Sequence, residues 1–289
     1  QAGHGLSRMP SYVAQVRSGK VDGTAAPRVD APAPGLLRVD AAHGFAFPAL
    51  DAGLDALIPV ARAQGIAGLT VHRSHHAGQL GAHVERLADA GLVALMVANT
   101  PGAMAPWGGR TPLLGTNPIA FAVPRDGTVP LVIDLSLSAV ARGKVMAAKR
   151  KGEAIPEGIA LDADGQPTTD PEAALTGTMV PAGGAKGAAL ALMVEVMAAA
   201  LTGANLAGDA SSLFDGEGDP PGLGQTVIAI DAGAASGGAF AATLERLVAA
   251  IEADGAARLP GATRMARRAR IEIEVADAVM ADLRDLAGA

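Results

Sequence analysis

The sequence contains no cysteine, which excludes disulfides, thiolate catalysis and cysteine-based zinc sites. Any imidazole chemistry must come from its six histidines. Only 2% of the residues are aromatic, so the core has to be built mainly from Ala, Val, Leu, Ile and Met. The formal charge of −6 and the lack of interleaved aromatic and basic residues argue against nucleic-acid binding. The lack of cysteine fits a cytoplasmic protein.

No segment is long and apolar enough to predict a membrane partner. The most apolar run, residues 185–203, is shorter than the roughly 20 apolar residues that a span needs, and it carries Glu195 near its centre. We interpret this run as a buried helix. The chain begins at Gln1 and not at Met, and we expect it to be a fragment.

The hydrophobic residues, 49% of the 289, follow an alternating strand and helix pattern. Strands are predicted at 36–40, 66–71, 92–98, 119–123, 131–134 and 226–231. Helices are predicted near 54–61, 81–91, 138–152, after 187 and at 239–253. Prolines at 27, 32 and 34 predict an extended connection over 26–35, after an N-terminal helix. The fold class is therefore α/β.

Nucleotide-binding fingerprints are also missing, because the chain has neither G-x-G-x-x-G nor G-x-x-x-x-G-K-[ST]. The absence predicts a fold other than the Rossmann type. Two long loops remain, 99–118 and 208–224, and loops of that length are usually functional or disordered. The second is a surface loop or lid. Its acidic residues lack the ligand spacing of a calcium loop, so no metal is predicted.

His75 and His76 follow directly after a predicted strand. Adjacent residues of an extended segment point to opposite sides, so at most one of them faces a given pocket. A neutral imidazole is the usual proton carrier when an alcohol becomes a ketone. The alternative is that both rings face solvent or satisfy partners in the core.

His4, Arg8 and Tyr12 are spaced at intervals of four. In a helix they form one stripe that presents a proton carrier, a cation and a phenol together. Arginine binds a carboxylate bidentately, so this stripe suits a 2-keto or 2-hydroxy acid. The alternative is a solvated helix face.

Two glycine-containing turns, 115–118 and 181–187, have N–H groups that can cradle a phosphate. The second opens a long helix, whose N-terminus is electropositive. Neither has the spacing of a known phosphate fingerprint. The arginines of segment 264–270 contact a dinucleotide phosphate or, in the alternative, form a solvated face.

Several of these stretches, in order and over nearly the whole chain, resemble the malate/L-lactate dehydrogenase type 2 family. The matching pieces are HGLSRMPSYVAQVRSGKVDG, SHHAGQLG, APWGGR, GTNPIAFAVP, VIDLSLSAVARGK, IPEGIALDADGQPTTDP and PAGGAKGAALALMVE. Within the family, these pieces are most similar to the sequences of the (2R)-3-sulfolactate dehydrogenase branch. Family members usually begin some 40 residues earlier, which agrees with the expected fragment.

The resemblance implies the non-Rossmann NAD(P)-binding α/β fold of malate/L-sulfolactate dehydrogenases. It also implies a homodimer in which the partner helps to form the active site. The catalytic residues implied are His76, His4, Arg8 and Tyr12. The predicted cofactor-binding residues are Thr100, Gly115, Asn117, Asp134, Leu135, Ser136, Lys144, Gly183, Gly184 and Arg264. The imino-acid reductase branch has Ser where this chain has Gly3 and an acid where it has Lys144, so the charge relay of that branch does not transfer.

We predict a substrate-side and dimerisation segment at 1–65, together with 240–289, and a cofactor-binding domain at 66–239. The predicted function is NAD- or NADP-dependent interconversion of a small 2-hydroxy acid and its 2-keto acid. One alternative is an NADPH-dependent reductase of cyclic imino acids. Another is a catalytically silent nucleotide-binding homologue.

Overall fold

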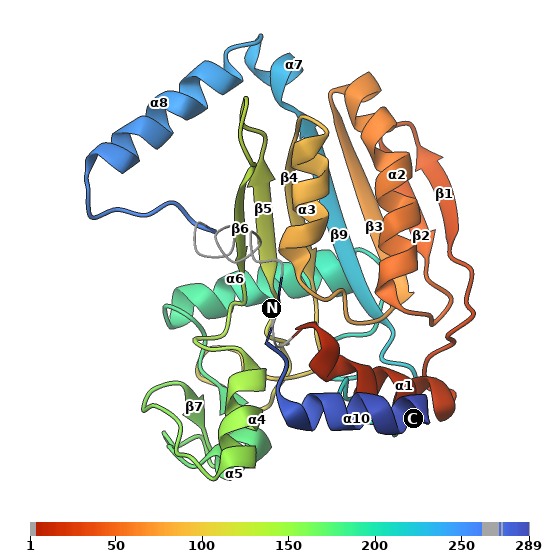
Figure 1. Cartoon of the computed structure of the whole chain (residues 1–289), viewed down its shortest axis with the longest axis vertical. Helices are drawn as coiled ribbons and strands as arrows, with labels where there is room; N and C mark the ends of the chain where they lie inside the picture. Colours follow the sequence, from red (N-terminus) through yellow and green to blue (C-terminus); the bar gives the residue numbers. More distant parts are fainter. Residues whose placement is uncertain (1–3, 262–271, 273, 289) are drawn as a thin grey trace.

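A computed structural model describes residues 4–261, 272 and 274–288. Its main feature is a seven-stranded sheet in the order β1-β2-β3-β9-β4-β5-β6 (Figure 1). The strands are β1 (Arg28–Ala33), β2 (Leu36–Asp40), β3 (Ile66–Ser74), β4 (Leu92–Ala98), β5 (Ile119–Val123), β6 (Leu131–Leu135) and β9 (Leu223–Asp231). Strands β2 and β3 pair in parallel, and the other pairs are antiparallel.

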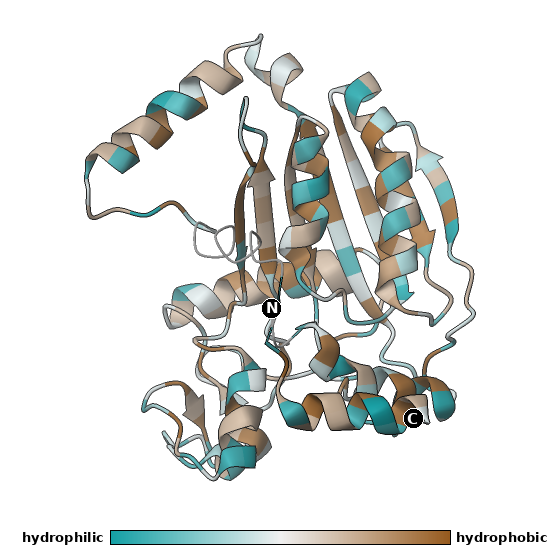
Figure 2. Cartoon of the chain, viewed as in Figure 1, coloured by the Kyte–Doolittle hydropathy of each residue, from teal (hydrophilic) through white to brown (hydrophobic). Residues whose placement is uncertain are grey.

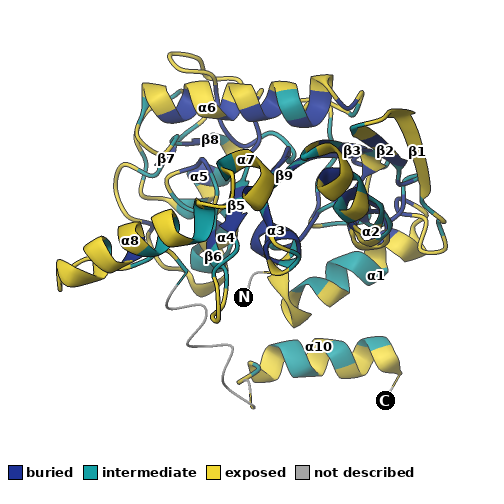
Figure 3. Ribbon diagram, turned by 90° about the horizontal axis from the view of Figure 1, so that it is seen from above, coloured by how far each residue is buried: buried dark blue, intermediate teal, exposed yellow. Residues whose placement is uncertain are grey.

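Helices cover both faces of the sheet. Helices α2 (Ala46–Gln64) and α3 (Leu80–Asp89) lie on one face, and α6 (Ala185–Glu195) lies on the other (Figures 1 and 3). The central strands are largely hydrophobic, while α2 and α3 alternate hydrophobic and hydrophilic residues (Figure 2). The helices can therefore cover the sheet with their hydrophobic residues. Leu50, Leu54 and Leu57 of α2 are fully buried against the sheet. The structure confirms the predicted α/β class.

A smaller lobe joins the sheet on the side of α6. It contains α4 (Arg142–Lys151), α5 (Pro171–Thr176) and a two-stranded sheet of β7 (Ala160–Leu161) and β8 (Thr178–Met179). A second hydrophobic cluster connects this lobe to α6 and to β4, and it includes Met104, Val145, Met179 and Val194. Helix α6 continues into a π-helical turn, η3 (Val196–Ala200).

The remaining helices lie at the two ends of the molecule. A 3-10 turn, η2 (Leu6–Arg8), leads into α1 (Met9–Arg17), which contacts α10 (Asp277–Ala287). Helices α7 (Ala232–Ser236) and α8 (Phe240–Ala253) follow β9 at the other end (Figure 1). Among the described residues, no helix is long and apolar enough to cross a membrane.

One prediction from the prolines was wrong, because residues 28–33 form strand β1 and not an unpaired connection. The strand lies at the edge of the sheet and pairs only with β2, and its register shifts between Asp30 and Ala33, on either side of Pro32. An edge strand with such an irregularity accommodates proline, since the missing N–H faces no neighbour.

The predicted division at residue 65 does not coincide with a break in the sheet. Strand β2 on one side of it pairs along its whole length with β3 on the other. The division was made by role, substrate side against cofactor side, and it stays a prediction. Part of the 240–289 segment lies outside the described residues.

Candidate active site

His76 lies just beyond the end of β3, in the short segment that leads to α3. Gly78 turns this segment with φ of +67°, and a Cβ there would lie 2.9 Å from the ring of Phe47, so only glycine fits. The start of α3 is fixed from another strand, because Gly81 N donates to the Asp134 carboxylate at 2.8 Å. A carboxylate at a helix N-terminus is favourable.

Three predicted catalytic side chains meet at the His76 ring. The Tyr12 hydroxyl lies 2.8 Å from His76 Nδ1, and His4 Nδ1 lies 3.2 Å from His76 Nε2. The rings of His4 and His76 are stacked, with centroids 5.2 Å apart. Both nitrogens of His76 therefore have a partner within the cluster, and His4 is the most exposed of the three side chains.

Burial sets the charge state of this cluster. The pKa of His76 is well below its ordinary value, chiefly through burial and further through Arg8, His4 and His75. Loss of hydration and the nearby Arg8 also lower the pKa of His4, while Asp134 opposes them. Burial raises the pKa of Tyr12. At neutral pH both imidazoles are neutral, and the phenol keeps its proton.

Arg8 brings a positive charge to the same place. It is the last residue of η2, it is half-buried, and its Cζ lies 4.6 Å from the centroid of the Phe214 ring. Its charge lowers the pKa of both His4 and His76, so the guanidinium and the imidazoles share one site. A cation next to neutral proton carriers suits a carboxylate that reacts at the adjacent carbon.

His75 is buried in the core, although its ring still lies 5.9 Å from the ring of Tyr12. It is 1% exposed, and its Nε2 lies 2.7 Å from Gln15 Oε1. Gln225 Nε2 donates to the His75 carbonyl at 3.1 Å. Burial lowers the pKa of His75 to about 4. The alternative that a ring satisfies partners in the core is therefore correct for His75, while His76 faces the cluster.

The predicted helical stripe is only partly correct. His4 precedes the helix, Arg8 ends the 3-10 turn, and Tyr12 is in α1. His4 and Tyr12 nevertheless both reach the His76 ring, and the charge of Arg8 lowers the pKa of His4 and His76.

The predicted cofactor residues of loop 99–118 form contacts within the loop and with α6. Thr116 N donates to Thr100 Oγ1 at 2.9 Å. Asn117 is fully buried and donates at 2.8 Å to both the Ala191 carbonyl and the Glu195 carboxylate. A Cβ on Gly115 would lie 2.3 Å from the Thr100 carbonyl, so Gly115 permits this close approach. The Asn117 amide nitrogen is thus occupied within the protein, while its buried Oδ1 has no hydrogen-bond partner among the described residues.

The predicted cofactor residues in the last part of β6 and after it have different surroundings. Asp134 caps α3, as described above, while Leu135 is 46% exposed. The Ser136 hydroxyl lies 2.9 Å from the Ser138 hydroxyl. Lys144 is exposed in the first turn of α4. Arg264, the remaining predicted contact, lies outside the described residues.

Gly183 and Gly184 form a turn suited to a phosphate. Both have positive φ, +74° and +64°, and Gly184 begins α6 without any side chain that caps its first N–H groups. Trp107 is 66% exposed and lies over this turn, since a Cβ on Gly184 would lie 3.4 Å from its ring. Uncapped N–H groups and an accessible flat ring fit a dinucleotide.

Sequence reasoning missed Trp107 and Phe214 as individual residues. Both lie in the two loops that were singled out for their length, and Trp107 is the only tryptophan of the chain. Loop length therefore marked the segments, while the contacts of these rings appear only in three dimensions.

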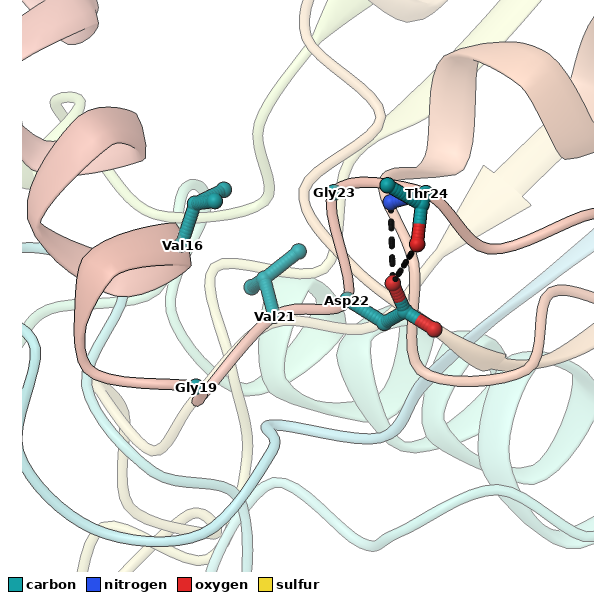
Figure 4. Close-up of a pocket in the computed structure, with 6 residues that line it drawn as sticks. All are labelled: Val16, Gly19, Val21, Asp22, Gly23 and Thr24. Atoms are coloured by element: carbon teal, nitrogen blue, oxygen red, sulfur yellow. Dashed lines mark hydrogen bonds between the residues drawn. The ribbon is translucent and has the colours of Figure 1, made fainter.

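A separate pocket lies at the C-terminal end of α1. Val16, Gly19, Val21, Asp22, Gly23 and Thr24 line it (Figure 4). Asp22 there accepts hydrogen bonds from the backbone and hydroxyl of Thr24, both at 2.8 Å. None of the predicted site residues lines this pocket.

A sheet with helices on both faces, a neutral imidazole pair next to a guanidinium, and an uncapped helix N-terminus together define an α/β protein built to act on small acids. The chain belongs to the malate/L-lactate dehydrogenase family, whose model matches residues 1–284. This confirms the resemblance of its sequence.

The relatives of this chain include both types of enzyme considered above. The chain is 55% identical over 285 residues to a (2R)-3-sulfolactate dehydrogenase (NADP(+)) of Chromohalobacter salexigens, covering 98% of this chain and 85% of that protein. It is 47% identical over 293 residues to a Δ¹-pyrroline-2-carboxylate/Δ¹-piperideine-2-carboxylate reductase of Pseudomonas putida, covering 99% and 85%.

Solved structures share the whole fold. A Δ¹-piperideine-2-carboxylate reductase of Pseudomonas syringae superposes with a TM-score of 0.91 at 44% identity, covering 98% of this chain and 86% of that one. A sulfolactate dehydrogenase of Methanocaldococcus jannaschii gives 0.89 at 28% identity, covering 99% and 85%. These likenesses confirm the predicted fold type of malate/L-sulfolactate dehydrogenases.

Proposed function

We propose that this chain is an NAD(P)-dependent oxidoreductase that interconverts a small 2-hydroxy acid and its 2-keto acid, with a substrate of the sulfolactate, malate or lactate kind. The observation that carries the proposal is the meeting of His4, His76 and Tyr12 next to Arg8. The 55% identity to an NADP-dependent sulfolactate dehydrogenase supports the substrate class and the cofactor.

Arg8 binds the substrate carboxylate and thereby orients C2 toward the imidazoles. The family resemblance implies both His76 and His4 as catalytic residues. Because Tyr12 and His4 occupy both nitrogens of His76, we propose that His4 takes the hydroxyl proton directly. His76 shares this proton through its hydrogen bond to His4, Tyr12 restricts the tautomer of His76, and His4 releases the proton to solvent or returns it to the substrate in reduction.

A bound nicotinamide would supply the hydride acceptor for C2 in oxidation and the hydride donor in reduction. We propose that Gly183 and Gly184 hold a phosphate of the dinucleotide and that Trp107 covers one of its rings. Thr100, Gly115, Asp134, Leu135, Ser136 and Lys144 remain predicted contacts. The amide nitrogen of Asn117 is already bonded, so a cofactor contact would use its Oδ1 or its backbone.

A panel of 2-keto acids, scored with both NADPH and NADH, tests the reaction. We expect NADPH oxidation with sulfopyruvate, oxaloacetate or pyruvate. Oxidation with Δ¹-piperideine-2-carboxylate and with none of the keto acids would support the imino-acid reductase instead, which the 47% identity to such an enzyme favours. Nucleotide binding without turnover of any of these compounds would indicate a silent homologue.

We also propose that the enzyme is a homodimer and that its interface is the outer face of α6, which lies outside the dimerisation segment predicted from the sequence. This face carries Leu190, Leu192, Met193, Val196 and, beyond η3, Leu201, which are 41% to 62% exposed. Figure 3 shows the exposed side of α6 turned away from the sheet. Such an apolar stripe is usual for an interface between subunits.

Sedimentation of the Leu192→Glu variant tests this interface. We expect a dimer for the native chain and a monomer for the variant, because a charge is placed within the apolar stripe. Ile66→Glu, at a residue 53% exposed on β3, is the matched control and should remain dimeric. A monomeric native chain would contradict the proposal.

Location in the cytoplasm stays a proposal, supported by the lack of cysteine and testable by fractionation.

A further inference from the structure

Lys20 is a buried lysine whose ammonium is surrounded by oxygens of one loop. Its side chain is 0% exposed. The Nζ donates to the carbonyls of Ser212 at 2.7 Å and Glu217 at 2.5 Å, and it lies 3.4 Å from the carbonyl and 3.5 Å from the carboxylate of Asp215. A buried charge is costly unless it is paired and hydrogen-bonded, so these oxygens are held around it.

The same loop is attached to α1 at two further points. Gln15, also fully buried, donates to the Leu213 carbonyl at 3.1 Å. A Cβ on Gly216 would lie 3.1 Å from the Ala14 carbonyl, so the loop backbone touches the helix there. The loop segment 212–217 is therefore registered against the helix that carries Tyr12.

Phe214 lies between two loop residues that are hydrogen-bonded to the segment 15–20. Its neighbour Leu213 is held by Gln15, and its neighbour Asp215 is held by Lys20. The ring itself is 37% exposed and lies under the Arg8 guanidinium, 4.6 Å from Cζ. A guanidinium over an aromatic face is attracted by the ring quadrupole, by about 0.5–1 kcal/mol at exposed sites.

We propose that Lys20 is a positioning residue for substrate binding, which acts by holding loop 212–217 so that Phe214 supports Arg8 in the orientation that binds the carboxylate. The inference rests on the proposed function, in which Arg8 is the carboxylate ligand. Lys20 and Phe214 do not themselves touch the substrate.

The test compares Lys20→Met, Phe214→Leu and the double variant. Each single variant should raise KM for the 2-keto acid about fivefold, which is the fold-change that corresponds to a lost interaction of about 1 kcal/mol. The kcat value and the Kd of NADPH should stay unchanged. The double variant should raise KM no further than the single ones, because both changes release the same guanidinium.

Several results would overturn the proposal. A purely structural lysine would lower the melting temperature of Lys20→Met and leave KM as it is. Additive effects in the double variant would mean that Lys20 does not act through Phe214. Should Lys20→Met fail to fold, an unchanged KM in Phe214→Leu, a change at a partly exposed residue, is enough to refute the idea. Absence of turnover in the native chain would instead refute the proposed function, and the two failures are thus distinguishable.

Discussion

At the scale of single residues, the cluster around His76 depends on two hydrogen-bond partners that lie 64 and 72 positions away in the chain. Tyr12 restricts the tautomer of His76, and His4 connects its other nitrogen to solvent. Removing either partner should disturb proton transfer without emptying the cofactor site, because neither side chain belongs to the glycine turn at α6.

We therefore expect graded losses in the cluster. His76→Ala should lower kcat at least about 100-fold, the usual contribution of positioned proton transfer. Tyr12→Phe should lower it about 3- to 10-fold, since one hydrogen bond is worth about 1 kcal/mol. NADPH titration should give the native Kd in both.

His72→Asn is the matched control for this series. His72 is on β3, near Arg38 and Asp40, and does not touch the cluster. Its kcat should equal that of the native chain. Full activity of His76→Ala on a working substrate would remove His76 from the mechanism.

At the scale of elements, α6 connects the predicted cofactor loops. Glu195 in its last turn is 5% exposed, and its carboxylate accepts hydrogen bonds from the Ala207 backbone at 2.7 Å and from Asn117 at 2.8 Å. Asn99 lies 3.4 Å from the same group. Glu195, the charge that makes this segment unsuitable for a membrane span, thus holds two loops to one helix.

The start of α6 permits a specific test. Gly184→Ala should weaken NADPH binding about fivefold or more, because alanine at φ of +64° costs about 1 kcal/mol and its Cβ meets Trp107 at 3.4 Å. The turn then relaxes away from the conformation that exposes its N–H groups. Quenching of Trp107 fluorescence on titration with NADPH measures the Kd.

Gly152→Ala controls for backbone strain alone. Gly152 has φ of +67° at the end of α4 and open space where its Cβ would lie. It should destabilise the fold without changing the Kd of NADPH. Equal Kd values for Gly184→Ala and the native chain would contradict the assignment of this turn to the phosphate.

At the scale of the whole molecule, every histidine has its pKa lowered by loss of hydration. This holds for His4, His43, His72, His75, His76 and His83, and burial is the largest cause at each. The folded protein therefore keeps neutral imidazoles at a pH where the unfolded chain is already protonated.

These lowered pKa values determine how the free energy of unfolding changes with pH. Below the ordinary pKa of about 6.5 the unfolded chain binds more protons than the folded one, so the free energy of unfolding falls as pH decreases. The loss continues to about pH 4, the pKa of His75 in the fold, and His75 alone accounts for roughly 3 kcal/mol.

Urea unfolding at pH 7.5, 6 and 5 should show a falling midpoint, before most carboxylates titrate. The decrease should be smaller in His75→Gln, which lacks one of the buried imidazoles. A midpoint that stays constant between pH 7.5 and 5 would mean that the histidines are not buried as neutral groups.

The sequence by itself determined the α/β class, the positions of six of the seven strands in the main sheet and, through the family resemblance, the candidate residues of the cluster. Hydrophobic periodicity is local, and strands such as 92–98 and 119–123 matched their predicted bounds to the residue. The glycine turn before α6 was visible because positive φ requires glycine.

Only the tertiary structure decided that His75 pairs with Gln15 in the core, that Asn117 faces inward, and that Asp134 caps α3. It also brought Phe214 under Arg8 and Lys20 into the loop oxygens. These contacts join residues far apart in the chain, and no local pattern records them, because they depend on how the helices and loops pack around the sheet.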